Sequence, residues 1–184
     1  MFNRVIEFIE RKKIKKRLNL DYTPHIRRGM QLIGAKYIKV GKSFSAGENV
    51  ILEAWDSHCN QKFTPFIEIG DEVFINRRTH ITSISFISIG SNVLIGSDVL
   101  ISDNNHGGSK SKGDLLSHPR TRDLISKGPV VIENDVWIGD KVIILGNVKI
   151  GCNSIIGAGS VVTKDIPAYS VAVGNPAKIV RKFK

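Results

Sequence analysis

At 184 residues, with 41% hydrophobic content, the chain is long enough for one domain with one sizeable core. Its formal net charge of +10 is concentrated at one end, because residues 1–40 hold 11 Lys/Arg against 3 acidic residues. A nucleic-acid-binding domain usually carries a basic stripe across its folded body, so this distribution argues against that class. No segment has the apolar length of a signal-peptide core or a membrane span, and Cys59 and Cys152 form no CxxC pair. We therefore expect a cytoplasmic protein in a reducing environment.

Residues 1–20 are predicted to form a basic amphipathic helix. Val5, Ile6, Ile9, Ile14 and Leu18 are expected on one apolar face, opposite Lys and Arg side chains. Two roles remain open for this helix. It is expected either to cap the open end of the fold that follows, or to contact anionic lipid at the inner face of the membrane.

Residues 33–173 repeat with a period of six. The clearest stretch carries six aliphatic residues in consecutive registers: Ile132, Ile138, Ile144, Ile150, Ile156 and Val162. A small or acidic residue usually follows each of them, and a small or branched residue stands at the fifth place. A period of six fits neither a helix nor a simple alternating strand. It predicts a triangular solenoid in which three hexapeptides form one coil and the aliphatic side chains fill the interior.

Two segments interrupt the repeat, and a basic segment follows it. Residues 54–64 separate two coils. Residues 104–129 are rich in Gly, Ser, Lys and His and show no hydrophobic period, and an irregular loop of this length is usually functional or disordered. The last coil ends at 174–176, after which the segment to residue 184 is expected to form a short helix or strand. The chain is thus predicted to be a single domain over 1–184.

The stretch from Val136 to Pro167, followed by Val173-Gly174-Asn175-Pro176-Ala177-Lys178, resembles the hexapeptide-repeat acyltransferases and, among them, the sugar O-acetyltransferases. The resemblance extends from about residue 40 to residue 181. It implies an all-β fold, namely a left-handed parallel β-helix with a short N-terminal helix and a long loop outside the solenoid. It also implies a homotrimer with active sites between chains, acetyl-CoA as cosubstrate, a saccharide acceptor, no nucleic-acid partner and no metal. The sequence of residues 103–107, Asp-Asn-Asn-His-Gly, is similar to the corresponding segment of enzymes that act on cell-surface polysaccharides.

Acetyl transfer from a thioester to a hydroxyl requires a group that removes the hydroxyl proton, and histidine suits this task near neutral pH. The resemblance implies that His106, at the start of the long loop, is the general base. Asp103 or Asn105 is expected to orient its ring, although both residues are also typical of loop turns.

The resemblance also implies an acceptor site, which is assigned to Asn76, Ser83, Ser85 and Asn105. Asn76 matches the position that contacts the acceptor sugar, although asparagine is equally suited to a coil corner. Ser83 and Ser85 lie where some sugar acetyltransferases carry an acidic acceptor contact, so the acceptor is expected to differ from theirs.

Coenzyme A needs a narrow slot for its pantetheine arm and cations for its phosphates. The resemblance assigns the cofactor site to Trp137, Gly139, Ala158, Gly159, Ser160, Thr163, Lys164, Lys178 and Arg181. Alternatives remain for each group, since all coil corners are small, basic tails are often only solvated, and Trp137 is also suited to packing between subunits.

Two other functions remain as alternatives. The γ-class carbonic anhydrases share this solenoid and bind zinc through three histidines, and His80, His106 and His118 are the candidates here. Their spacing does not match that family. A non-catalytic trimeric scaffold would keep the coils but would not need His106 together with the cofactor residues.

Overall fold

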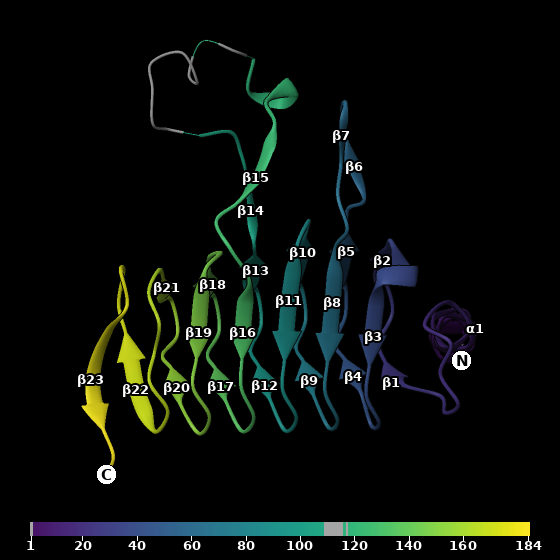
Figure 1. The fold of residues 1–184 in the computed structure, drawn as a ribbon. Helices are drawn as coiled ribbons and strands as arrows, with labels where there is room; N and C mark the ends of the chain where they lie inside the picture. Colours follow the sequence, from purple (N-terminus) through teal and green to yellow (C-terminus); the bar gives the residue numbers. More distant parts are fainter. Residues whose placement is uncertain (1, 109–115, 117) are drawn as a thin grey trace.

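The computed structural model describes residues 2–108, 116 and 118–184, and its body is a left-handed parallel β-helix (Figure 1). In the described part of the chain, three sheets form the sides of a triangular prism. Sheet A contains β1 (His25–Ile26), β4 (Ser45–Ala46), β9 (Phe74–Ile75), β12 (Leu94–Ile95), β17 (Trp137–Ile138), β20 (Ile155–Ile156), β22 (Ser170–Val173) and β23 (Lys178–Lys182). Sheet B contains β2 (Gln31–Ile33), β5 (Ile51–Ala54), β10 (His80–Ser83), β13 (Leu100–Ser102), β18 (Ile143–Ile144) and β21 (Val161–Val162). Sheet C contains β3 (Ile38–Val40), β8 (Phe66–Ile69), β11 (Phe86–Ile89), β16 (Val130–Ile132) and β19 (Val148–Ile150).

Successive hexapeptides supply the three sheets in turn, so strands of neighbouring coils pair in parallel. The predicted all-β class and triangular solenoid are confirmed. The solenoid begins earlier than the expected residue 33, because β1 and β2 already pair with β4 and β5. It ends in an antiparallel pair, since the basic C-terminal segment forms β23 against β22 rather than a helix.

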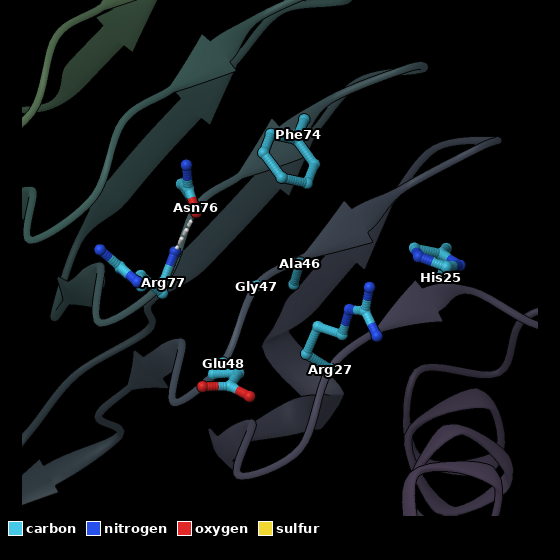
Figure 2. Close-up of a pocket in the computed structure, with 8 residues that line it drawn as sticks. All are labelled: His25, Arg27, Ala46, Gly47, Glu48, Phe74, Asn76 and Arg77. Atoms are coloured by element: carbon cyan, nitrogen blue, oxygen red, sulfur yellow. Dashed lines mark hydrogen bonds between the residues drawn. The ribbon is translucent and has the colours of Figure 1, made fainter. Parts of the chain in front are cut away.

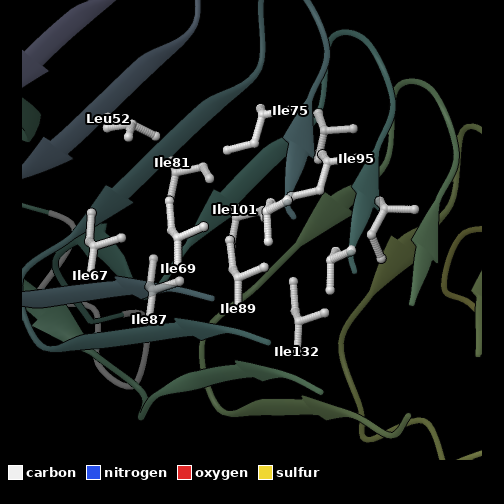
Figure 3. Close-up of a cluster of buried hydrophobic side chains, with 14 of the residues drawn as sticks. Leu52, Ile67, Ile69, Ile75, Ile81, Ile87, Ile89, Ile95, Ile101 and Ile132 are labelled. Carbon is white, nitrogen blue, oxygen red and sulfur yellow. The ribbon is translucent and has the colours of Figure 1, made fainter. Parts of the chain in front are cut away.

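The interior of the prism is a column of branched aliphatic side chains (Figure 3). The six residues from Ile132 to Val162 that define the repeat are each at most 1% exposed. Strands of successive coils lie about 4.8 Å apart, so each layer of side chains packs directly on the next. This close stacking also explains the glycines at the corners. A Cβ atom at Gly139 would lie only 2.7 Å from the amide nitrogen of Ala158 in the next coil.

The helix α1 (Phe2–Arg17) covers the end of the solenoid next to β1 and β2 (Figure 1). Ile14 and Leu18 are buried in the common core. Arg11 Nε donates to the carbonyl of Ile26 at 2.9 Å, and Arg17 Nη2 donates to the carbonyl of Leu32 at 2.7 Å. The helix therefore provides apolar cover and hydrogen-bond donors to the first coil, as a cap does.

The prediction that one apolar face of this helix includes Val5, Ile9 and Ile14 is wrong. Val5 is 53% exposed and Ile9 is 47% exposed, whereas Ile14 is 5% exposed. At about 100° per residue, positions 9 and 14 point about 140° apart, so they cannot share a narrow face. Within the described ranges, no helix has both the length and the apolar content needed to span a membrane.

Two hairpin arms leave the prism at the corner where sheet B turns into sheet C (Figure 1). The short arm consists of β6 (Ser57–His58) and β7 (Gln61–Lys62). The long arm begins with β14 (Asn104–His106) and returns through the 3-10 turn η2 (Pro119–Thr121) and β15 (Leu124–Ser126). The predicted irregular loop 104–129 is therefore a hairpin at its base. A second 3-10 turn, η1 (Ala35–Tyr37), lies in the first coil.

Candidate functional site

His106 lies on the long arm, outside the prism, with an exposed side chain. It is the last residue of β14 and pairs with Leu124 across the antiparallel ladder. The next residue, Gly107, has φ of +86° and donates its amide to the carbonyl of Asp123 at 2.8 Å. The ladder fixes the backbone of His106, and the left-handed residue turns the chain away from it. An imidazole held in this way can present a nitrogen to an approaching ligand.

The short arm packs against the long arm and holds it. The side-chain amide of Gln61 makes two hydrogen bonds to the backbone of Leu124, accepting from the amide at 2.7 Å and donating to the carbonyl at 3.2 Å. His58 Nε2 lies 3.2 Å from the carbonyl oxygen of Arg122, and its ring meets the ring of His106 edge to face at 5.4 Å. Leu124, which pairs with His106 on β15, and Arg122, two residues earlier in the chain, thus both contact the short arm.

Sequence reasoning found no motif at His58 and did not consider Gln61. Their role could have been found from the positions of the two interruptions in the repeat. Both interruptions follow a strand of sheet B, so both segments must leave the prism at the same corner and lie side by side. The base of the short arm is also fixed. Asp56 accepts hydrogen bonds from Lys36 and Tyr37, and these contacts, led by Lys36, lower the pKa of its carboxyl group.

The carboxylate of Asp103 forms hydrogen bonds with the corner of the chain beneath the long arm, at residues 83–85, and not with the ring of His106. Its carboxylate is 1% exposed and accepts from Ser83 Oγ at 2.6 Å and from the amides of Ile84 and Ser85 at 2.9 Å each. None of the described contacts joins it to His106. The expected orienting role is therefore corrected to an anchoring one, since four donors, with Asn104 Nδ2 at 3.2 Å, already occupy its oxygens.

The other residues expected at the acceptor site differ in accessibility. Ser83 is fully buried and donates to Asp103, so its side chain cannot reach a ligand. Ser85 is half-buried and Asn105 is exposed. Asn76 is half-buried and lines a pocket of about 440 Å³ on the outer side of sheet A (Figure 2). This pocket, called here the arginine pocket, is lined by His25, Arg27, Ala46, Gly47, Glu48, Phe74, Asn76 and Arg77.

An exposed aromatic and aliphatic row continues from the arginine pocket along sheet A. Phe74, Leu94 and Trp137 occupy the same register on β9, β12 and β17. Leu94 is 44% exposed and Trp137 is 52% exposed, which is unusual for side chains of this size. The expectation that Trp137 points outward holds, and the row offers apolar surface to a ligand or a second chain.

The remaining residues expected to bind the cofactor fall into buried and exposed sets. Ser160 is fully buried, donates to the carbonyl of Gly157 at 2.6 Å and accepts from the amide of Gly174 at 3.0 Å. Its hydroxyl therefore holds the last corner together and is not available to a ligand, and the expected contact of this corner with the cofactor through backbone amides stays a prediction. The accessible members are Ala158, Gly159, Thr163, Lys164, Lys178 and Arg181. A side chain at Gly159 would meet no atom within 4 Å, so a ligand has open access to this backbone.

The expected phosphate ligands lie on or close to two strands at the same end of the solenoid, and the amide of Ala177, just before Lys178, donates to the carbonyl of Val161 on β21 at 2.8 Å. Lys178 and Arg181 are on β23, at the edge of sheet A, where Arg181 pairs with Val171. Lys164 follows β21, which is the last strand of sheet B.

The proposed base lies on another side of the prism from two of the other expected site residues. His106 emerges at the corner of sheets B and C, whereas Asn76 and Trp137 face outward from sheet A. A single chain does not bring the proposed base, acceptor residue and cofactor residues together.

The three histidines considered for zinc are also separate. His80 Nε2 lies 2.9 Å from a carboxylate oxygen of Glu53, and His118 Nδ1 accepts from the amide of Arg120 at 3.2 Å. His106 contacts His58. In the part of the chain that the structure describes, no three His, Cys, Asp or Glu side chains are grouped to hold a metal ion.

Comparisons with known proteins agree with this architecture. A family model described as bacterial transferase hexapeptide (six repeats) matches residues 129–164. A protein of Escherichia coli K12 named as a lipopolysaccharide biosynthesis O-acetyltransferase, WbbJ, is 35% identical over 148 residues, which are 79% of this chain and 72% of WbbJ. Galactoside O-acetyltransferase of the same organism is 39% identical over 64% of this chain, and this match spans 54% of the relative.

Solved structures show the same fold. A hexapeptide-repeat acetyltransferase of Vibrio cholerae, crystallised with acetyl-CoA, aligns with a TM-score of 0.63 and 26% identity, covering 99% of this chain and 81% of its own. AntD, an N-acyltransferase of Bacillus cereus, aligns with a TM-score of 0.70 over 88% of this chain and 80% of its own, at 19% identity. At that identity, the likeness to AntD concerns the fold alone.

Proposed function

The chain belongs to the hexapeptide-repeat acyltransferases, and on that premise we propose that His106 is the general base with which it acetylates a sugar hydroxyl. It is an acetyl-CoA-dependent acetyltransferase, and its acceptor is a saccharide destined for a cell-surface polysaccharide. The observation that carries the proposal for His106 is its placement. The imidazole is exposed on a backbone that the β14–β15 ladder and the short arm hold in place.

The proposed chemistry is a direct transfer. Neutral His106 removes the proton from the acceptor hydroxyl as its oxygen attacks the carbonyl carbon of the thioester. The tetrahedral intermediate collapses by breaking the carbon–sulfur bond, and the departing thiolate takes the proton from the imidazolium. The products are the acetylated sugar and free coenzyme A. No protein nucleophile is needed, so Cys59 and Cys152 have no part in the step.

The protein is further proposed to act as a homotrimer, because one chain leaves the site incomplete. The long arm departs from β13, which belongs to the same coil as β12 with its exposed Leu94. If the threefold axis runs along the solenoid, the arm of one chain meets sheet A of its neighbour at the height of Leu94 and Trp137. His106 would then face the apolar row. Sedimentation equilibrium checks this directly, and a stable monomer at working concentration would contradict it.

The outward side of α1 supports a second proposal, peripheral contact with anionic lipid. Val5, Phe8 and Ile9 are exposed there, and Lys12 and Lys13 are exposed beside them. Apolar side chains flanked by lysines are typical of helices that lie on a membrane surface. Flotation with vesicles containing anionic lipid is expected to carry the protein, and Phe8→Glu is expected to abolish this. Equal flotation of the two proteins would exclude the contact.

The test of the catalytic proposal is His106→Ala. Turnover is expected to fall by about 10²–10⁴-fold, which is the usual contribution of a positioned general base. Coenzyme A affinity is expected to remain, because the arm lies outside the core. His80→Ala and His118→Ala are the controls, since Glu53 and Arg120 account for their contacts. Near-parental turnover of His106→Ala with a verified acceptor would show that another group is the base.

A further inference from the structure

The arginine pocket is hollow where Gly47, which has no side chain, lies between two residues with longer side chains. Arg27, Gly47 and Asn76 follow the paired strands β1, β4 and β9 and lie in one row, since the amides of Arg27 and Gly47 donate to the carbonyls of Ala46 and Ile75 at 2.9 and 2.8 Å. Gly47 is required by the stacking of the coils, because a Cβ atom there would lie 2.6 Å from the amide nitrogen of Arg77. A hollow therefore remains between two longer side chains (Figure 2).

Arg77, which lines the hollow, and the adjacent Arg78, which does not, differ in their bonding. Arg78 donates two hydrogen bonds to the carboxylate of Asp98, at 2.6 and 2.7 Å, and this contact raises the pKa of Arg78. Arg77 lines the pocket, and among the described residues its guanidinium makes no hydrogen bond or ion pair. Five N–H donors of Arg77 are thus available to a ligand, whereas Arg78 is already neutralised.

The other charges of the pocket reduce this potential without removing it, because Glu48 also lines the pocket and Arg27 forms an ion pair with Glu7. A carboxylate oxygen of Glu48 lies 3.6 Å from Nε of Arg28, which is outside the pocket. Nη1 of Arg27 lies 3.7 Å from a carboxylate oxygen of Glu7. Both separations exceed the range of an N–H···O hydrogen bond, so Arg27 is ion-paired with Glu7 but its N–H donors are not hydrogen-bonded to that carboxylate. Asn76 adds another donor. Its Oδ1 accepts from the amide of Arg77 at 2.8 Å, which leaves the NH₂ group for a ligand.

The pocket therefore offers two guanidinium groups and an amide donor beside the half-buried ring of Phe74. Planar guanidinium groups with free donors match the oxygens of phosphate better than those of a neutral sugar. The pocket is also far along sheet A from Lys178 and Arg181, because β12, β17, β20 and β22 lie between β9 and β23. The cation groups at the two ends of the sheet are thus suited to two separate anionic ligands.

We propose that the arginine pocket binds the phosphate or diphosphate that is attached to the acceptor sugar. This rests on the proposed function and narrows it, because the acceptor then is an activated, phosphate-linked sugar rather than a free saccharide. The pocket lies one coil from Leu94, at whose height the long arm departs, so the sugar itself would extend from the pocket toward the base of a neighbouring chain.

The experiment measures pyrophosphate binding to the full chain by calorimetry in saturating coenzyme A, which fills the cofactor's own phosphate sites. Arg77→Gln is expected to weaken pyrophosphate binding by about 10-fold or more, the effect of losing charge-assisted hydrogen bonds. Arg78→Gln is the matched control and is expected to change it by less than about 3-fold. Thermal melting of both variants checks that the coils are intact. Uridine diphosphate and geranyl diphosphate are then compared as competitors, which distinguishes a nucleotide-linked from a lipid-linked acceptor.

Three results would overturn the proposal: no pyrophosphate binding to the coenzyme A-saturated protein, equal weakening by the two variants, or a loss of coenzyme A affinity in Arg77→Gln. The last result would assign the pocket to the cofactor. A failure of the proposed function is recognised separately, as a protein that binds neither coenzyme A nor acetyl-CoA, and pyrophosphate binding remains measurable in that case.

Discussion

Sheets A and C are built from the same repeat, yet their outer surfaces differ. On sheet C the polar and aromatic side chains contact one another. Lys39 pairs with Glu68 at 2.9 Å, Lys149 pairs with Glu133 at 2.6 Å, and the rings of Phe66 and Phe86 stack at 6.2 Å. A hollow of about 320 Å³ on this sheet is lined by Lys39 and Glu68, and another of about 270 Å³ is lined by Lys149 and Asp165.

The outer surface of sheet A also has ion pairs at its corners, formed by Arg27, Arg28 and Arg78, but several of its other side chains lack such partners. Leu94 and Trp137 are about half exposed, and among the described residues the guanidinium of Arg77 makes no hydrogen bond or ion pair. A surface whose charges are paired needs nothing further from its surroundings, whereas unpaired guanidinium groups and exposed large apolar side chains mark a place of binding. The difference supports the proposals that place ligands and a neighbouring chain on sheet A rather than on sheet C.

The largest expected effect concerns the cap, on which both sheets depend. Ile14→Ala is expected to lower the free energy of unfolding by about 2–5 kcal/mol, because it opens a cavity beneath α1. Ile9→Ala is the control on the same helix, and its exposed side chain should contribute little. Chemical denaturation measures both variants. Equal stability of Ile14→Ala and the parent would show that the helix does not close the solenoid.

The next effect concerns the proposed phosphate ligands of coenzyme A. Arg181→Ala and Lys164→Ala are each expected to weaken coenzyme A binding by about 10–100-fold, because a charge-assisted hydrogen bond contributes about 1.5–3 kcal/mol. Lys149→Ala on sheet C should leave the affinity unchanged. Calorimetry distinguishes these outcomes, and unchanged affinity in both variants would remove Arg181 and Lys164 from the site.

A smaller effect is expected from the aromatic surfaces. Trp137→Ala should weaken coenzyme A binding by about 10-fold, since it removes apolar surface that is buried only when the site is occupied. Phe66→Ala removes an aromatic ring from sheet C and should reduce thermal stability instead. The reverse pattern, with Phe66 affecting affinity and Trp137 affecting only stability, would contradict the assignment of the two sheets.

The smallest effect concerns the pH dependence of the pair on sheet C. The hydrogen bond from Lys149 lowers the pKa of Glu133 from its ordinary value of 4.5 and raises the pKa of Lys149 from 10.5. A lowered carboxyl pKa stabilises the fold above pH 4.5, and this contribution is lost as the pH falls through the folded value. The raised amine pKa contributes below pH 10.5 and is lost above it. Glu133→Gln should therefore reduce thermal stability slightly near pH 7 and not at all in strong acid, and a larger difference in acid would contradict this.

The sequence by itself determined the body of the protein. Each aliphatic residue from Ile132 to Val162 defines its own strand and turn, so the period specifies a coil locally and repeats it. The family motif also pointed to His106 and Trp137, both of which the structure exposes. These features depend on residues a few positions apart, which is why a single sequence reveals them.

The tertiary structure alone decided the surroundings of His106 and the arginine pocket. Gln61 contacts Leu124, which is 63 residues away in the chain. The carboxylate of Asp103 accepts a hydrogen bond from Ser83, because a buried carboxylate without hydrogen-bond donors would be unfavourable. Arg77 and Arg78 are adjacent in sequence, and Asp98 of the next coil lies near both, but its carboxylate accepts hydrogen bonds from the side chain of Arg78 and not from that of Arg77. Such contacts depend on which coils become neighbours. The six-residue period predicts that successive coils are neighbours, but it does not specify which polar side chains bond between them or across the two arms.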